Sequence, residues 1–151
     1  MTKEQIITLA AAIAAAVIVL IILIIRIRRR KKYGHLSIDD MEGHEFEAFC
    51  AEMLEADGFS DVTMTGASRD FGADILASRD GVTYAIQCKC YSDMVGVKSV
   101  QEVYAAKDFY DRMVGVVMTN SYFTAPAIQA ADKLKVIMWD RDYISDRGYT
   151  E

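Results

Sequence analysis

Cysteine and histidine are scarce in this chain of 151 residues, and their scarcity limits the kinds of site that it can hold. The cysteines are Cys50, Cys88 and Cys90, an odd number, and in a reducing compartment we expect no disulfide. A tetrahedral zinc site would need further ligands, and His35 and His44 are the only histidines, which disfavours zinc. We therefore expect the cysteines to be small buried side chains of the core.

Basic residues are scarce too, outside one short cluster. From residue 33 to residue 151 there are ten lysines and arginines against 21 aspartates and glutamates, a formal charge of −11. Proteins that hold nucleic acid through phosphate contacts normally carry a basic surface. This composition is adverse to nucleic-acid binding, and most of the acidic side chains are expected on a solvated surface.

The chain has no internal repeat, but it does have a long apolar run. Residues 6–25 are uncharged, and as a helix rising about 1.5 Å per residue they would span about 30 Å, the thickness of a bilayer's hydrocarbon core. Six lysines and arginines follow within residues 26–32, against Lys3 alone before the run, which predicts a cytoplasmic C-terminal side. A cleaved signal peptide would need cations before the run and a shorter core. We therefore predict a single-pass transmembrane helix at residues 6–25 in the cell membrane, after a tail at residues 1–5.

The regions around this run complete the predicted domain organisation. Alanines four residues apart, such as Ala10 and Ala14, would let two helices pack closely in a homodimer, although alanine is equally compatible with lipid. The cations are expected to set topology and to contact anionic lipid. They begin a connector at residues 26–43, which leads to a domain at residues 44–142 and a polar tail at residues 143–151.

Hydrophobic periodicity predicts an α/β domain after the connector. Apolar residues at helical spacing predict helices at residues 44–56 and 97–113, and a third helix capped by Thr124. Alternating or β-branched runs predict strands, at residues 62–64, 73–79, 82–90, 114–119 and 135–139. The predicted order is α-β-β-β-α-β-α-β, a mixed sheet flanked by helices.

The hairpin predicted at residues 73–90 gives the most specific indication of a functional site. Asp80-Gly81 between two β-rich runs favours a two-residue turn, and this turn sets a register in which Asp74 lies opposite Gln87. Lys89 lies two residues further along the same face of its strand. A carboxylate, an amide and a lysine would then meet at the open end of the hairpin.

Two interpretations of this corner follow from the spacing. Oxygen ligands and a lysine at the corner of a half-buried sheet would suit metal-dependent phosphodiester chemistry. A lysine within a strand also needs an anion, and Asp74 could supply it in a structural ion pair without catalysis. Glu47, at the edge of the apolar arc of the first helix, is either the acid closest to the sheet or an ordinary rim glutamate. Spacing alone leaves these alternatives open.

Five short motifs, taken in order, resemble the Mrr-like branch of the PD-(D/E)xK nuclease superfamily. They are Glu45-Phe46-Glu47-Ala48-Phe49, Asp70-Phe71-Gly72-Ala73-Asp74, Gln87-Cys88-Lys89, Val100-Gln101-Glu102 and Thr119-Asn120-Ser121-Tyr122-Phe123-Thr124. The resemblance covers nearly all of residues 42–142 and leaves out the apolar run. It implies a restriction-endonuclease-like fold and a deoxyribonuclease that depends on Mg²⁺, with Mn²⁺ as an alternative metal.

The resemblance also implies a role for each matched residue. Asp74 matches the metal-binding aspartate, Glu47 matches the helix glutamate, and Lys89 matches the catalytic lysine. Gln87 stands where most of the superfamily has an acidic ligand, and it would offer its carbonyl oxygen to the metal. The supporting matches are Gln101 and the loop residue Asp70.

The sequence therefore predicts a membrane-anchored endonuclease that faces the cytoplasm and hydrolyses DNA, in restriction or DNA processing. The main alternative is the same fold acting as a DNA-binding or protein-interaction module with weak or absent catalysis, which the acidic surface favours. A third interpretation is a membrane-tethered adaptor in which the corner is a structural ion pair. The lack of a separate target-recognition domain is consistent with a partner that supplies specificity.

Overall fold

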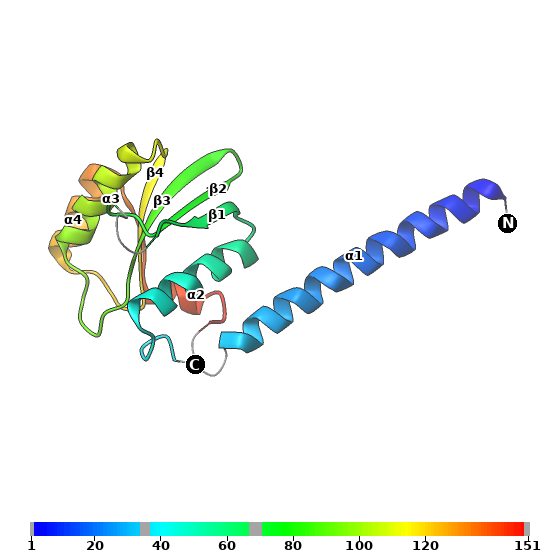
Figure 1. Cartoon of the computed structure of the whole chain (residues 1–151), viewed down its shortest axis with the longest axis horizontal. Coiled ribbons are helices and arrows are strands. Elements are labelled where there is room, and N and C mark those ends of the chain that lie inside the picture. The colour runs from blue at the N-terminus through cyan, green and yellow to red at the C-terminus, as the bar shows by residue number, and fades with distance from the viewer. Residues whose placement is uncertain (1, 34–36, 67–70, 150–151) are drawn as a thin grey trace. The chain divides into compact units, whose positions relative to one another are not determined.

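The computed structural model describes residues 2–33, 37–66 and 71–149, and it divides into two compact units, Met1–His35 and Leu36–Glu151. The first unit is the long helix α1 (Lys3–Tyr33), blue in Figure 1. Among the described residues, no helix has the length and hydropathy of a membrane span, so the structure does not support the transmembrane helix predicted at residues 6–25. Several side chains of that run, Ile6 and Ile22 among them, lie outside the described set.

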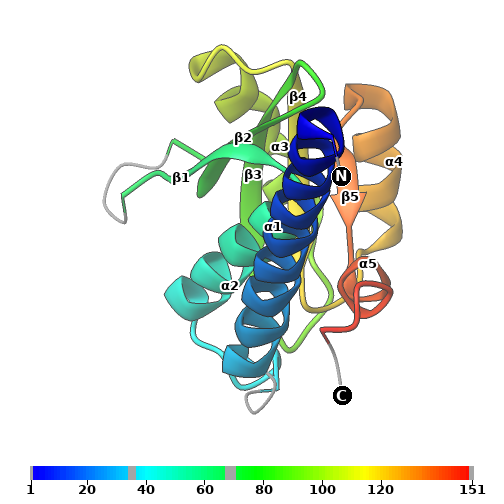
Figure 2. The same ribbon diagram turned by 90° about the vertical axis from the view of Figure 1, so that its right-hand side faces the viewer.

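The second unit is a mixed sheet with helices on both faces (Figure 1). Its elements are α2 (Gly43–Ala56), β1 (Ser60–Met64), β2 (Ile75–Arg79), β3 (Val82–Lys89), α3 (Val97–Phe109), β4 (Val114–Thr119), α4 (Ala125–Leu134), β5 (Ile137–Trp139) and α5 (Arg141–Ser145). The described strands lie in the order β1-β2-β3-β4-β5, and Figure 2 shows β1 and β5 at opposite edges. The β1–β2 and β2–β3 pairs are antiparallel, whereas β3–β4 and β4–β5 are parallel. These observations confirm the predicted mixed α/β fold.

The β2–β3 hairpin forms with the predicted register. Ile75 pairs with Ile86, and Arg79 pairs with Val82. Between them, Asp80 and Gly81 have φ angles of 51° and 80°, the pair of positive values that a type I′ turn requires. Because this turn has two residues and no bulge follows it, the register holds along the whole hairpin.

The end of the chain differs from the predicted polar tail. Residues 141–145 form α5, and its Ile144 is fully buried. The Asp140 side chain caps this helix by accepting hydrogen bonds from the N–H groups of Asp142 and Tyr143. Five helical residues are too few for a periodic apolar pattern, so hydrophobic periodicity does not predict this helix.

Two further boundaries lie several residues from their predicted positions. Helix α3 ends at Phe109 rather than at residue 113, because Asp111 adopts a left-handed φ of 52° and the chain turns toward β3. The Met113 N–H then donates to the Thr83 carbonyl oxygen at 3.1 Å. At the other end, Ile38 and Met41 of the predicted connector are buried in the second unit.

Candidate functional site

Asp74 and Gln87 meet at the open end of the hairpin, as the register predicts. Asp74 Oδ2 accepts hydrogen bonds from Gln87 Nε2 at 2.5 Å and from the Cys88 N–H at 2.6 Å. Asp74 is only 7% exposed, and Gln87 is only 3% exposed. Two donors on one oxygen offset the cost of burying a carboxylate. The structure therefore holds Asp74 in a fixed position just before β2, beside the last residues of β3.

The corner is more enclosed than a half-buried sheet would make it. Leu76 and Ala85, next along the same face of the hairpin, pack in a cluster with Ala106 of α3. Helix α2 packs against β1 and β3, and Figure 1 shows α2 and α3 on opposite sides of the sheet. The prediction of a half-buried sheet was therefore wrong, because α3 covers the face that carries Asp74 and Gln87.

Lys89 forms an ion pair with Glu102 of α3. Its Nζ lies 3.4 Å from Glu102 Oε2, and the exposed Lys98 lies 3.6 Å from Oε1 of the same carboxylate. The Lys89 and Glu102 side chains are 19% and 31% exposed. Glu102 is therefore the anion that pairs with Lys89, whereas one of the two interpretations of the sequence gave this part to Asp74.

Glu102 is a site residue to which the sequence reasoning gave no role, although it lies in the matched motif Val100-Gln101-Glu102. Glu102 follows the buried Ser99 by three residues and precedes the buried Ala106 by four. Residues with this spacing share one face of a helix, which here is the face toward the sheet. Its neighbour Gln101, which the resemblance selected, is exposed.

A pocket of about 320 Å³ lies beside the corner, and Gln87, Lys89 and Glu102 line it. Phe71 and Gly72 form another part of its wall. Gly72 has a φ of +90°, and a Cβ atom there would lie 2.7 Å from the Glu102 carbonyl oxygen. The loop before Asp74 can close onto α3 because residue 72 has no side chain.

Replacing Gly72 with alanine should therefore destabilise the domain. We expect a loss of about 1–2 kcal/mol from the left-handed backbone and about 1–3 kcal/mol from crowding against α3. Gly81→Ala is the matched control, because Gly81 has a similar φ of +80° and open space around it. Urea denaturation of both variants measures the difference, and equal losses would show that the approach to α3 is unimportant.

Glu47 is linked to the corner through Cys88. A hydrogen bond with Cys50 and burial raise the pKa of the Cys88 thiol well above its usual value, and the charges of Asp74 and Glu47 add to the shift. Glu47 is half-buried on α2, close enough to β3 to act on this thiol. Its role as a metal ligand stays a prediction. Asp70, the other predicted supporting residue, lies outside the described residues.

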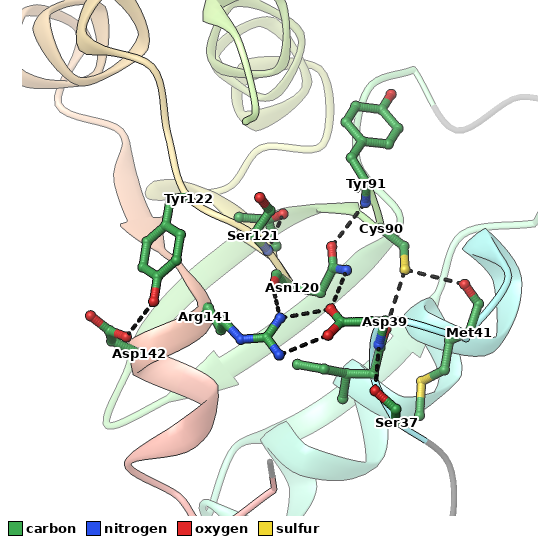
Figure 3. A network of polar contacts seen from close by, with 12 residues as sticks. Ser37, Asp39, Met41, Cys90, Tyr91, Asn120, Ser121, Tyr122, Arg141 and Asp142 are labelled. Atoms are coloured by element: carbon green, nitrogen blue, oxygen red, sulfur yellow. Dashed lines mark hydrogen bonds and ion pairs between the residues drawn. The ribbon is translucent and has the colours of Figure 1, made fainter. Parts of the chain in front are cut away.

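A second polar cluster lies where β4 and β5 end (Figure 3). Arg141 donates to both carboxylate oxygens of Asp39, at 2.6 and 2.8 Å, and to the Asn120 carbonyl oxygen at 2.9 Å. The hydrogen bond from Arg141 lowers the pKa of Asp39 below its usual value. Sequence reasoning did not assign this cluster, because it joins residues about 100 positions apart.

Solved structures with a similar fold include two of interest. One, titled a protein of unknown function, AF1548, has a TM-score of 0.55 and 23% identity over 64% of this chain. The other is the DNA modification-dependent restriction endonuclease AspBHI, with a TM-score of 0.56 and 22% identity over 83% of this chain. At these identities the similarity shows the fold alone, and the matches span 57% and 34% of those two chains. A comparison with curated proteins finds no match.

A family model gives a stronger assignment than the structural similarity. The model for Mrr_cat, restriction endonuclease, matches residues 38–147. This range covers well over half of the chain and includes Asp74, Gln87 and Lys89 as well as the second polar cluster. The chain therefore belongs to the Mrr_cat restriction endonuclease family.

Proposed function

We propose that this chain is a metal-dependent endonuclease that hydrolyses phosphodiester bonds in DNA. The observation that carries the proposal is the contact between Asp74 and Gln87, with Lys89 lining the pocket beside them. Family membership supports nuclease activity, and AspBHI, which shares the fold, is a restriction endonuclease that acts on modified DNA. Restriction or DNA processing is therefore the process that we assign to this chain.

The residues at the corner suit Mg²⁺ or Mn²⁺. Among the residues that the structure describes, no three His, Cys, Asp or Glu side chains form a metal cluster. Mg²⁺ needs only one or two carboxylates, since it keeps several waters and binds substrate phosphate. Asp74 and Glu47 would supply carboxylate oxygens, and Gln87 would supply its carbonyl oxygen. When bound, the ion would lower the pKa of a water and offset phosphate charge.

Gln87 would have to turn its amide to bind a metal. Its Nε2 now donates to Asp74 Oδ2, so the carbonyl oxygen points away from that carboxylate atom. Rotation of the amide exchanges the two groups with little change in shape. In its present orientation the amide of Gln87 holds Asp74 in place. After rotation, Gln87 and Asp74 would share the metal.

Lys89 would act on the substrate directly. Its ammonium group would orient the attacking water or offset the negative charge that develops on the phosphate. Glu102, 3.4 Å from Nζ, holds the ammonium at the pocket before DNA arrives. We assign Lys89 as the catalytic residue and Glu102 as a positioning residue.

Cleavage of plasmid DNA by the full-length chain in detergent tests this proposal. We expect nicking and linearisation in Mg²⁺ or Mn²⁺, and no cleavage in excess EDTA. Metal-dependent DNA binding without cleavage would favour the alternative, a DNA-binding module of the same fold. Cleavage that continues in EDTA would contradict a metal-dependent reaction.

The net charge of −11 for residues 33–151 is the feature that this proposal must accommodate. A bound divalent cation offsets only a small part of it. A specificity partner or a second copy of the chain would add the surface that DNA binding needs. Both partners stay predictions from the sequence.

Membrane attachment also stays a prediction, and the sequence of the N-terminal unit supports it. Residues 6–25 are uncharged, and cations follow at residues 26–32. The described large apolar side chains of α1, such as Ile13 and Leu20, are exposed at 56% each. We propose that this unit holds the domain at the cytoplasmic face of the cell membrane.

Fractionation of cells that express the full-length chain tests the attachment. We expect the protein in the membrane pellet after an alkaline wash. Replacing Ala14 and Val17 with lysine should release it, because each charge at the centre of a span costs about 2.5–3.5 kcal/mol. Ala14→Leu with Val17→Leu is the matched control. A wild-type chain found in the soluble fraction would contradict the attachment.

A further inference from the structure

A second pocket, of about 440 Å³, lies at the same end of the sheet as the candidate nuclease site. Tyr91, Asn120 and Tyr122 are among its lining residues. Tyr91 follows Lys89 by two residues, and Asn120 follows Thr119, which pairs with Lys89 across β3 and β4. From strand spacing and chain geometry, the Cα atoms of Asn120 and Lys89 are no more than about 9 Å apart. A DNA strand held at Lys89 would therefore pass this pocket.

The floor of the pocket is a rigid polar network (Figure 3). Asn120 is 2% exposed, accepts from the Tyr91 N–H at 2.8 Å and donates to Asp39 at 3.2 Å. Arg141 closes the network through its paired bonds to Asp39. Every bond joins segments that are distant in the sequence, so the shape of the pocket is set before a ligand binds.

The charge of the pocket disfavours a phosphate as its occupant. The Arg141 guanidinium is already neutralised by Asp39. Asp142 adds a second carboxylate, which accepts a hydrogen bond from the Tyr122 hydroxyl at 3.0 Å. A phosphate would meet at least as much negative as positive charge here, whereas a neutral ring would not be repelled.

The walls of the pocket suit a flat, neutral group. Tyr91 and Tyr122 are 49% and 44% exposed, so both rings are accessible at its rim. Ser92 and Ser121 add hydroxyl groups, which can donate or accept hydrogen bonds. Aromatic rings beside hydrogen-bonding groups are how proteins hold unstacked nucleobases.

We propose that this pocket holds one unstacked base of the DNA strand whose neighbouring phosphate lies at Lys89. Tyr122 stacks on this base, Tyr91 stacks on a neighbouring base of the same strand, and the network of Asp39, Asn120 and Arg141 between the two rings fixes the pocket (Figure 3). The proposal rests on the proposed function for its substrate class. It makes the pocket a determinant of which DNA positions are cut.

Binding of fluorescent oligonucleotides to the full-length chain in detergent tests the proposal, with Ca²⁺ in place of Mg²⁺. We expect Tyr91→Ala and Tyr122→Ala each to weaken binding by about 5- to 150-fold, the usual effect of losing one stacked base. Tyr122→Phe should restore affinity because it keeps the ring. Tyr104→Ala, at an exposed tyrosine of α3, is the matched control.

Oligonucleotides that lack one base at successive positions identify the occupant. At one position, removal of the base should weaken binding to wild type but cause no further loss in Tyr122→Ala. The unstacked base would come either from a single strand or from a duplex out of which it is flipped. Binding to a single strand, a mismatched duplex and a paired duplex distinguishes these two sources. Tyrosine-dependent binding confined to single strands indicates a single-stranded substrate, whereas a tyrosine-dependent gain at a mismatch indicates a base flipped out of a duplex.

The outcomes separate this inference from the proposed nuclease. Tyrosine variants that bind every oligonucleotide like wild type would overturn the base pocket, even if wild type cleaves DNA in Mg²⁺. Tyrosine-dependent binding without cleavage in Mg²⁺ would support the pocket and count against the nuclease. A wild-type chain that binds no DNA would overturn the base pocket as well. Melting temperatures should be unchanged in the tyrosine variants, since both rings are exposed.

Discussion

Replacing Asp74 with asparagine is expected to lower DNA cleavage by about 100-fold or more. Asparagine keeps the shape of the side chain and can still accept hydrogen bonds from Gln87 and from the Cys88 N–H. It loses the negative charge that would hold the metal. We therefore expect the fold to survive and the activity to fall at every Mg²⁺ concentration, with a partial recovery at high Mg²⁺.

Initial rates of plasmid nicking over a series of Mg²⁺ concentrations measure this effect. Asp80→Asn is the matched control, because Asp80 lies at the other end of the same hairpin with its side chain 91% exposed. Asparagine also tolerates the left-handed φ of 51° at that turn. An Asp74→Asn protein that cleaves like wild type at low Mg²⁺ would exclude Asp74 as a ligand.

Replacing Lys89 with methionine should lower cleavage by about 100- to 1,000-fold, the usual effect of removing one group that stabilises a transition state. Methionine keeps most of the length of the lysine and removes only the ammonium. The free energy of unfolding should change by no more than about 1 kcal/mol. The reason is that Glu102 remains partly exposed and keeps Lys98 as a partner.

Lys98→Met is the matched control for Lys89→Met. Both lysines contact the same carboxylate, at 3.6 and 3.4 Å, but the Lys98 side chain is 87% exposed, against 19% for Lys89. We expect Lys98→Met to cleave DNA normally. A structural role for Lys89 would give the opposite pattern, with stability reduced by about 3–5 kcal/mol, as when a buried ion pair is broken.

Much of the candidate site was predictable because one local feature, the turn of the β2–β3 hairpin, determines which residues lie opposite one another. Asp80-Gly81 determines the turn, the turn determines the register, and the register brings Asp74 to Gln87. Each step depends on a few neighbouring residues, and such local preferences are strong for type I′ turns. The fold class followed for a similar reason, since the apolar patterns of the strands and helices are regular.

The remainder of the site depends on packing between distant segments. The partner of Lys89 is Glu102 because α3 lies over that end of β3, and a hairpin register carries no information about α3. The contact of Asp39 with Arg141 joins two segments that the sequence places at the margins of the domain. Both segments lie within the range matched by the family model, residues 38–147.

Plasmid cleavage by wild type, Asp74→Asn and Lys89→Met, measured side by side in Mg²⁺, tests the central claim most directly. All three proteins would be full-length and shown to be folded by their melting curves. We predict cleavage by wild type and almost none by either variant. Cleavage that survives both substitutions would show that the corner of Asp74, Gln87 and Lys89 is not the active site.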